Sequence, residues 1–491
     1  MAARIRIDGL KGEGAMRVRR SWVMTGLVGA LAAVAVITPL AVPAAAAVAP
    51  NIDTSVAPGN EAEDAIAVNL TNPSNVVTMS TLPDVVSGLF EGVTFDGGKT
   101  WTRRVIGAAT GFADICCDQQ LAWDTYGNLF MTYLDLNSPD VFVALSTDGG
   151  LTWRKVGDIV PTTPSGAAAQ TGAPSRQLNR AQASADQPSI SAAANSVWVS
   201  YTSFPSVVVQ ASGAAVTGLG LVGSFSPPQS VPTSLGMGDY GDTAVGPNGQ
   251  LLVTYQNPTG GQGHSHIFTA LDPDGLGPQG FDDPRLFAFS LVGGFDYIPA
   301  QPNRSVDAEA NLAWDRSGGP HTGRVYEIWT QEVGSESNDM DIMFQYSDDN
   351  GTTWTPPVRL NDDHTANSQF NPAIALDQVT GYVGVSWYDA RNDLGTGGRG
   401  DTDGIPNDDV QIWGTISTNG GVTFAPNFQI SQGTSNANDA QSFFDYGDYT
   451  HAAFQSHTFW PVWSDNSNST GTNPDGTLRQ LDLDTTGVTV R

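Results

Sequence analysis

The sequence predicts an all-β protein, a β-propeller of four-stranded blades with seven blades preferred. An eight-residue pattern, Ser/Thr-x-Asp-x-Gly-x-Thr-Trp, occurs at Thr94–Trp101, Ser146–Trp153 and Ser347–Trp354, with a near-copy at Ser417–Phe424. A longer unit of about 63 residues recurs seven times, which is enough chain for one four-stranded blade each. Long helical periodicity is absent, so the repeats indicate strands and hairpins throughout.

Each part of the eight-residue pattern favours a tight hairpin. The Asp can accept hydrogen bonds from the backbone of its own turn, and Gly adopts the positive φ that such a turn needs. The Thr and Trp then resume a strand, and the Trp supplies a large apolar anchor. We expect the aromatic residue of each copy to be buried between blades.

The longer unit begins with an acidic or Asn-bearing entry followed by an apolar strand. A second strand follows, and it ends in an aromatic residue with a polar residue two places later, as at Tyr133, Trp387 and Trp463. The units begin near Asp64, Asp118, Asp186, Asp242, Asp307, Asn371 and Asp448.

The last unit shows three strands, at 450–454, 459–463 and 478–483. The early segment 51–56 is expected to supply the fourth strand, which would close the ring and hide the sheet edges.

The N-terminus predicts export. Three arginines precede an apolar, Ala-rich run that ends in small residues near Ala49, which is typical of a secretory signal peptide over residues 1–49. A single propeller domain is then expected over residues 50–491, in a secreted, extracellular protein without stable membrane insertion. A membrane anchor is the competing interpretation of the same run.

The composition is strongly acidic, with 22 Lys+Arg against 50 Asp+Glu and a formal net charge of −28. Such a surface repels nucleic acid and anionic membranes, so nucleic-acid binding is not expected.

The eight-residue copies resemble the Asp-box, or bacterial neuraminidase (BNR) repeat, of secreted sialidase-like β-propellers. In that family the box is structural and lies on hairpin turns away from the active site, and six blades is the usual count. The resemblance implies a glycoside hydrolase of the exo-α-sialidase type. The early Arg-Ile-Pro signature of sialidases has no counterpart here, and their Tyr-Glu nucleophile pair is not placed. Arg304, Arg391 and Arg479 are the candidates for the arginines that line the channel in that family.

Carboxylates at the strand entries are the candidate catalytic groups. The first strands of propeller blades line one mouth of the central channel, and here their entries carry Asp118, Asp242, Asp307 and Asp448. Crowded carboxylates have divergent pKa values and perform acid–base chemistry, but they also cap turns or hold Ca²⁺. The tetrapeptide Asp-Tyr-Gly-Asp occurs twice, which adds Tyr240 and Tyr446 as candidate substrate-binding residues.

A loop after the sixth unit's second strand reads Trp-Tyr-Asp-Ala-Arg over residues 387–391. It resembles a Trp-Tyr-Asp-x-Arg signature of secreted sialidase-like propellers. Arg391 is expected to bind a carboxylate or hydroxyl groups of the substrate, with Tyr388 and Asp389 as further substrate-binding residues. The alternative is a structural salt bridge between Arg391 and Asp389.

An acidic loop with the pattern Asp-x-Asp-Gly is a candidate calcium site. Its oxygen-bearing residues resemble those of calcium loops, although the twelfth-position Glu of an EF-hand is replaced by Ile412. An unliganded surface turn is the alternative. The candidate ligands are Asp401, Asp403, Asn407, Asp408 and Asp409.

The only two cysteines, Cys116 and Cys117, are neighbours, so no long-range disulfide is available. Either they form a vicinal ring directly before Asp118, or they remain two buried thiols.

Two functions remain open from the sequence. The first is a secreted glycoside hydrolase that uses channel-mouth carboxylates on extracellular glycans. The second is a non-catalytic propeller that binds glycans or cell-surface partners. Either function predicts a carbohydrate as substrate or ligand, with Ca²⁺ as the one possible cofactor.

Overall fold

Seven antiparallel sheets of four main strands follow one another along the chain. The computed structural model describes residues 46–85, 87–162, 184–236, 238–258 and 261–491. The predicted signal peptide lies almost wholly outside these residues. Within them, regular structure consists of strands and two short 3-10 helices, η1 (Ala108–Thr110) and η2 (Ala437–Asp439).

The first four blades are numbered in chain order. Blade 1 contains β3 (Ala62–Val68), β4 (Val76–Thr81), β5 (Leu89–Thr94) and β6 (Thr102–Ile106). Blade 2 contains β7 (Ile115–Trp123), β8 (Leu129–Asp135), β9 (Ser138–Ser146) and β10 (Arg154–Ile159). Blade 3 contains β11 (Ser184–Ala193), β12 (Ser196–Phe204) and β13 (Val208–Gly218), with β14 (Leu221–Val222) and β15 (Gln229–Ser230) both paired to β13. Blade 4 contains β16 (Asp239–Val245), β17 (Leu251–Pro258), β18 (Ser265–Asp272) and β19 (Arg285–Ser290).

Blades 5 to 7 complete the set. Blade 5 contains β22 (Asn311–Trp314), β23 (Val325–Glu332), β24 (Met340–Ser347) and β25 (Val358–Arg359). Blade 6 contains β26 (Gln369–Asp377), β27 (Tyr382–Asp389), β28 (Asp409–Ser417) and β29 (Phe428–Gln429), with β30 (Ser435–Asn436) also paired to β28. Blade 7 contains β31 (Ala452–Gln455), β32 (Thr458–Asp465), β33 (Asp482–Thr485) and β2 (Ile52–Asp53).

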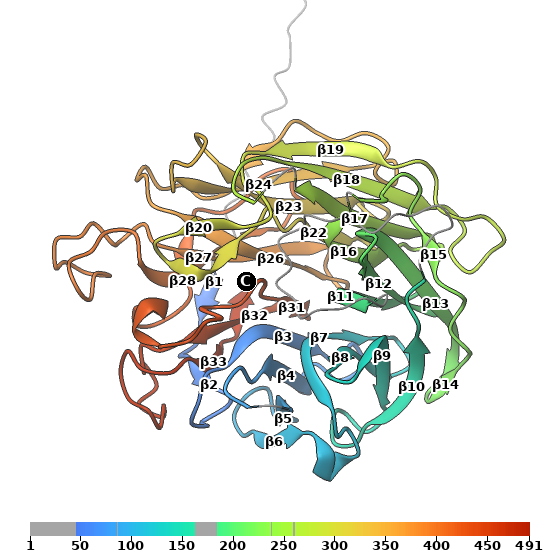
Figure 1. Ribbon diagram of the computed structural model, residues 1–491, viewed down its shortest axis with the longest axis horizontal. Helices are drawn as coiled ribbons and strands as arrows, with labels where there is room; N and C mark the ends of the chain where they lie inside the picture. The colour runs from blue at the N-terminus through green and yellow to red at the C-terminus, as the bar shows by residue number, and fades with distance from the viewer. Residues whose placement is uncertain (1–45, 86, 163–183, 237, 259–260) are drawn as a thin grey trace, which may run out of the picture. The chain divides into compact units, whose positions relative to one another are not determined.

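The seven blades form a ring around a central axis (Figure 1). Each first strand contacts the next one around the circle, in the order β3, β7, β11, β16, β22, β26, β31 and back to β3. A short hairpin, β20 (Asp296–Ile298) and β21 (Gln301–Val306), is inserted between blades 4 and 5. The predicted seven-bladed propeller is therefore confirmed.

An N-terminal strand closes the ring, as the sequence predicts. In β2, Ile52 pairs with Thr485 and Asp53 with Asp484 of β33, so blade 7 joins both ends of the fold. The third strand of this blade begins at Asp482 and not at Leu478, which has a left-handed φ of 52°.

A further strand, β1 (Ala46–Val48), pairs with β34 (Val488–Val490). This strand falls inside the predicted signal segment, whereas β2 begins after it.

The core lies between neighbouring blades. The aromatic residues that end the second strands, Tyr201, Tyr255, Trp387 and Trp463 among them, are at most 4% exposed. They join apolar clusters that combine residues of adjacent blades, such as blades 3 and 4 or blades 5 and 6. This is what a period of two in a strand predicts, because alternate side chains face the neighbouring sheet.

All four Asp-boxes form the hairpin between the third and fourth strands of their blades, in blades 1, 2, 5 and 6. In the second box, the Asp148 carboxylate accepts hydrogen bonds from the Thr152 backbone N–H at 2.8 Å and from its hydroxyl at 2.6 Å. The Ser146 hydroxyl oxygen accepts from the Gly150 N–H at 2.9 Å. The same backbone N–H bonds recur in the other boxes, so the motif is a self-contained turn.

The aromatic residue of each box contacts the preceding blade. The Trp153 indole N–H donates to Glu91 of blade 1, Trp354 packs edge-on against Phe287 of blade 4, and Phe424 packs against Phe344 of blade 5. These rings remain partly exposed. The expectation of full burial is corrected in this respect, because the box lies at the outer rim of the blade, where the neighbouring sheet covers one side only.

Candidate functional site: an acidic cluster around Arg304

The first strand of several blades enters through a β-bulge. Its register against the second strand shifts there, and a non-glycine residue in the shift adopts left-handed backbone: Glu63 (φ 60°), Asp118 (φ 53°), Gln187 (φ 43°) and Asn371 (φ 45°). Glu309 (φ 36°) has the same conformation just before β22. Such backbone is costly for residues other than Gly, and it recurs at functional sites, where bulges redirect side chains.

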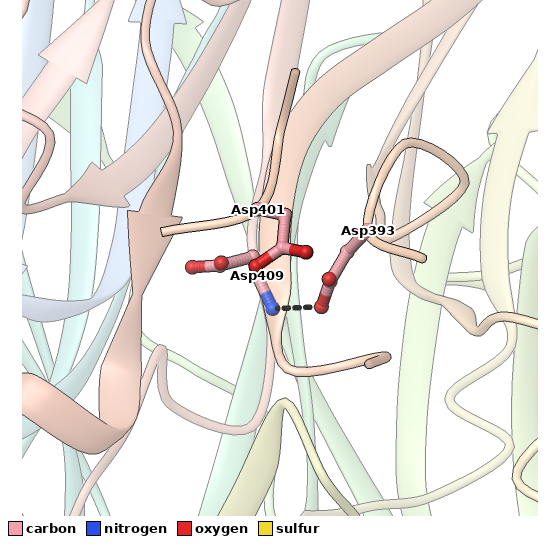
Figure 2. A group of neighbouring side chains, drawn as sticks. All are labelled: Asp393, Asp401 and Asp409. Atoms are coloured by element: carbon pink, nitrogen blue, oxygen red, sulfur yellow. Dashed lines mark hydrogen bonds between the residues drawn. The ribbon is translucent and has the colours of Figure 1, made fainter. Parts of the chain in front are cut away.

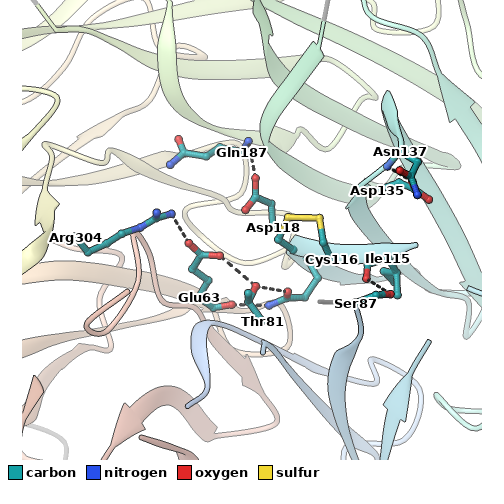
Figure 3. The surroundings of a disulfide bond; sticks show 12 residues. Glu63, Thr81, Ser87, Ile115, Cys116, Asp118, Asp135, Asn137, Gln187 and Arg304 are labelled. Carbon is teal, nitrogen blue, oxygen red and sulfur yellow. Dashed lines mark hydrogen bonds and ion pairs between the residues drawn. A yellow bond between two sulfur atoms is a disulfide. The ribbon is translucent and has the colours of Figure 1, made fainter. Parts of the chain in front are cut away.

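Acidic side chains from four blades lie close together where the first strands begin. Arg304 on β21 forms ion pairs with Glu63 of blade 1 (2.5 Å) and with Asp448, just before blade 7. The Gln187 backbone N–H of blade 3 donates to Asp118 of blade 2 at 3.2 Å, and its side-chain amide donates to Asp448 at 3.4 Å. Figure 3 shows Arg304 directed toward Glu63, with Gln187 above Asp118. We call Glu63, Asp118, Asp186, Arg304 and Asp448 the Arg304 cluster.

Two ends of one tetrapeptide hold Arg304 in place. Asp445 accepts hydrogen bonds from the backbone N–H groups of Asn303 (2.7 Å) and Arg304 (2.9 Å), while Asp448 pairs with the Arg304 guanidinium. The second Asp-Tyr-Gly-Asp motif thus positions the arginine through both of its carboxylates. An arginine fixed at backbone and side chain holds its guanidinium in one orientation.

The Asp118 carboxyl is held as an acid. Burial raises its pKa well above the usual value, the charges of Glu63 and Asp186 raise it further, and a hydrogen bond with Asp186 favours a proton between the two carboxyl groups. Arg304 opposes this shift. The cluster therefore contains a carboxyl that retains its proton beside carboxylates that an arginine neutralises.

Tyr449 adds a buried hydroxyl to this environment. Its Oη has no hydrogen-bond partner among the described residues, and burial and then the charges of Glu63, Asp118, Asp448 and Glu309 raise its pKa. The phenol is therefore a neutral donor surrounded by acids.

An aromatic ring lies against the arginine of the cluster. The Arg304 guanidinium stacks on the Phe444 ring at 4.6 Å, and the neighbouring Phe443 is 85% exposed. Arg304, Asp186 and Gln187 are partly exposed, whereas Glu63, Asp118 and Asp448 are less than a tenth exposed. A ligand would thus meet Arg304 and Asp186 first.

Of the four predicted catalytic residues, the structure brings Asp118 and Asp448 into the Arg304 cluster. Asp242 accepts hydrogen bonds from the backbone N–H groups of Thr243 (2.7 Å) and Leu312 (2.8 Å) and from the Ser189 hydroxyl (2.5 Å), which is the capping role considered for it above. Burial raises the Asp242 pKa, and these bonds lower it. Asp307 is buried just before β22.

The predicted substrate-binding residues lie elsewhere, with structural partners. Arg391 pairs with Asp389 and Asp362 and stacks on Trp413 at 4.1 Å, which is the salt bridge considered as the alternative. The rings of Tyr388 and Tyr446 stack on each other at 4.5 Å with no exposed surface.

We therefore correct the expectation that Arg391, Tyr388, Asp389 and Tyr446 face a ligand. Tyr388 is enclosed between blades 6 and 7, where its hydroxyl contacts Ser464 of β32, whereas Arg391 is engaged by Asp389 and by Asp362 of the segment after β25. The side chain of Tyr240 lies outside the described part of the structure.

Cys116 and Cys117 form a disulfide in β7, directly before Asp118 (Figure 3). The ring joins two consecutive residues, so it restricts the backbone that leads into the bulge at Asp118. It is thereby placed to fix the direction of the Asp118 carboxyl.

The acidic loop between β27 and β28 brings several carboxylates together. Ligand atoms of Asp393, Asp401 and Asp409 lie within 4.8 Å of one another, as do those of Asp403, Asp408 and Asp409. Burial, followed by the charge of Asp403, raises the Asp408 pKa to about 7.

Asn407 differs from the other predicted ligands of this loop. Its amide oxygen accepts from the Ser368 N–H and its nitrogen donates to the Asn338 carbonyl, so it serves the fold.

Sequence reasoning missed Glu63, Gln187 and Tyr449, and it named Arg304 only through the resemblance to sialidases. The missing signal was the register of the repeat. In each of blades 1, 2, 3, 5 and 6, the bulge residue stands three places before an aliphatic residue of the first strand, as Glu63 precedes Ile66. Aligning the units on that aliphatic residue, instead of on the first Asp, identifies the position.

The BNR/Asp-box repeat model matches residues 345–356, which include the third box. The chain is an Asp-box, or BNR-repeat, β-propeller, as the resemblance of its boxes to those of sialidase-like propellers predicts. No curated protein matches this Asp-box propeller.

Several solved structures are similar to the Asp-box propeller. One is a protein of unknown function from Dyadobacter fermentans DSM 18053, at 13% identity over 91% of this chain and 99% of that chain, with a TM-score of 0.47. The Penicillium chrysogenum alpha-L-arabinanase is 13% identical over 77% and 98%, with a TM-score of 0.42. The BP39L lectin from Burkholderia pseudomallei is 14% identical over 75% and 84%, with a TM-score of 0.45. At these identities the likeness concerns the fold alone.

None of the helices in the described part of the chain is long and apolar enough to cross a membrane.

Proposed function

We propose that this Asp-box propeller is a glycoside hydrolase whose active site is the Arg304 cluster. The observation that carries the proposal is the coexistence of two kinds of carboxyl group in one place. Asp118 shares a hydrogen bond with Asp186 and has a strongly raised pKa, while Glu63 and Asp448 are ion-paired with Arg304. Glycosidases need this pairing of a protonated acid with an ionised carboxylate.

The roles follow from the chemistry of each group. The Asp118–Asp186 pair would donate a proton to the leaving glycosidic oxygen, with Asp186 as its solvent-reachable member. The ionised Glu63 and Asp448 would stabilise the positive charge that develops on the sugar ring. Water would then attack the anomeric carbon and return a proton to the Asp118–Asp186 pair. Arg304 would bind a hydroxyl or carboxylate of the substrate, and Phe443 would offer an apolar face to the ring.

The experiment is a screen of the purified protein against chromogenic glycosides of neutral and acidic sugars, followed by variants on the substrate that is turned over. Asp118→Asn and Asp186→Asn should each lose at least about 100-fold in kcat, because each removes the shared proton. Asp242→Asn is the matched control, since its carboxylate caps the backbone and an Asn oxygen still accepts a bond.

Folding of each variant is checked by circular dichroism melting. Turnover of no glycoside in the screen, or full activity in both Asp118→Asn and Asp186→Asn, would contradict the proposal.

A second candidate function is glycan binding without catalysis. The observation that favours it is burial: Glu63, Asp118 and Asp448 expose less than a tenth of their surface, whereas Phe443 is 85% exposed. A binding site would then rest on Phe443 and Arg304. Glycan-array binding that Phe443→Ala abolishes, together with no turnover, would establish this function in place of the first.

We further propose that the protein is exported and that residues 1–49 are removed. Support comes from the position of β2, which begins at Ile52 and would still close the ring after cleavage. N-terminal sequencing of the protein from culture medium is the test. A mature protein that still begins upstream of Ala46 would contradict this.

A further inference from the structure

The loop from Ala390 to Asp408, between β27 and β28, and the first residue of β28, Asp409, together contribute five carboxylates. They form two groups of three that share Asp409: Asp393, Asp401 and Asp409, and Asp403, Asp408 and Asp409. Figure 2 shows the first group, in which the Asp401 carboxylate lies between those of Asp409 and Asp393 in this view. The site is separate from the Arg304 cluster and uses none of its residues.

Several of these carboxylates accept hydrogen bonds from backbone N–H groups of the same segment. Asp393 accepts from the N–H groups of Asp408 (2.8 Å) and Asp409 (3.0 Å), as Figure 2 shows for Asp409. Asp401 accepts from the N–H groups of Gly397 and Gly404, and the Thr402 hydroxyl donates to Asp409 at 2.7 Å. The loop is therefore organised around the acids, which keeps them close together in spite of their mutual repulsion.

One buried oxygen in this group lacks a partner. Asp408 is 3% exposed, and its Oδ1 has no hydrogen bond among the described residues, while its other oxygen accepts from Asn438 at 3.3 Å. Leaving a buried carboxylate oxygen unsatisfied beside other carboxylates is unfavourable unless a cation or a proton is present. Within the described residues, no Lys or Arg side chain forms a salt bridge with any of the five carboxylates.

We propose that Asp393, Asp401, Asp403, Asp408 and Asp409 form a Ca²⁺ site. Carboxylate oxygens are hard ligands, and Ca²⁺ accepts six to eight of them in flexible geometry, whereas Mg²⁺ demands an octahedron and keeps several waters. Five carboxylates from an irregular loop fit the first description. Relative to the sequence pattern, Asp393 replaces Asn407 as a ligand.

The test is calcium binding by the whole protein at pH 7 after treatment with EDTA. CaCl₂ at a hundredfold excess over Kd should raise the melting temperature by about 3 °C for a fold of this size. Isothermal titration calorimetry should show saturable binding with a defined Kd. MgCl₂ at the same concentration should produce a smaller shift. No response to CaCl₂, or an equal response to MgCl₂, would overturn the calcium assignment.

The decisive variant is Asp408→Asn, with Asp283→Asn as its control. Asp283 is exposed in the segment before β19 of blade 4, so this control removes one negative charge elsewhere. Asp408→Asn should lose the calcium shift and weaken Kd at least tenfold, while in EDTA it should melt no lower than the wild type, because a repulsive charge is gone.

Asp393→Asn is a second variant with the same expectation, and Asp283→Asn should respond to calcium like the wild type. A full calcium shift in both Asp408→Asn and Asp393→Asn would overturn the proposal, as would a loss of the shift in Asp283→Asn.

Discussion

Trp153 of the second Asp-box offers a direct test of how the boxes hold the ring together. Its ring packs against apolar residues of blades 1 and 2, and its indole N–H donates to Glu91 of blade 1 at 2.7 Å. Glu91 is fully buried and also pairs with Arg104, and burial raises its pKa to about 7. Trp153→Ala removes the ring and leaves a buried carboxyl oxygen without this donor.

The magnitude has two parts. Truncation of a fully buried Trp costs about 3–5 kcal/mol, and Trp153 is partly exposed, so the lower end of about 3 kcal/mol applies. The hydrogen bond to Glu91 accounts for about 1–2 kcal/mol of that loss. Trp153→Phe keeps most of the ring and loses the bond, so it should cost only about 1–2 kcal/mol.

The assay is guanidinium unfolding followed by far-UV circular dichroism, since the change removes a fluorophore. Phe443→Ala is the control, because this aromatic residue is exposed and should change the free energy of unfolding by less than about 0.5 kcal/mol. A loss below about 1 kcal/mol for Trp153→Ala, or one no larger than in the control, would show that the box aromatic does not link the blades.

Two further predictions concern the cysteines and the pH dependence of stability. Native protein that has not been exposed to a reductant should resist alkylation at Cys116 and Cys117. Intact mass spectrometry should show two added alkyl groups only after reduction. Two alkylated thiols without reductant would refute the disulfide. Burial raises the pKa of Asp64 and of Asp482 to about 8, so the folded chain keeps protons that the unfolded chain releases above about pH 4. The free energy of unfolding should therefore fall as pH rises from about 4 to about 8, by up to about 1.4 kcal/mol per pH unit for each proton. The measurement is a denaturant titration in EDTA at pH 5, 6 and 7. A free energy of unfolding that rises over this range would contradict the prediction.

The sequence by itself determined the repeat and therefore the ring. The Asp-box is a local turn whose hydrogen bonds span at most four residues, as between Asp148 and Thr152, so its pattern is legible without tertiary information. The alternation of aromatic and polar residues in the second strands likewise follows from a period of two. The closing strand was predictable because the last unit shows three strands and a propeller needs a fourth.

Only the tertiary structure decided which acidic residues lie in one cluster. Arg304 lies 241 residues from Glu63 and 144 from Asp448, and it comes from a hairpin that the repeat does not contain. Asp242 and Asp118 look alike in sequence, yet Asp242 accepts hydrogen bonds from two backbone N–H groups, whereas Asp118 lies beside the carboxyl groups of Glu63 and Asp186, which raise its pKa. The pattern places a carboxylate at each strand entry, but its partner and its protonation depend on the burial and the charges that ring closure brings beside it.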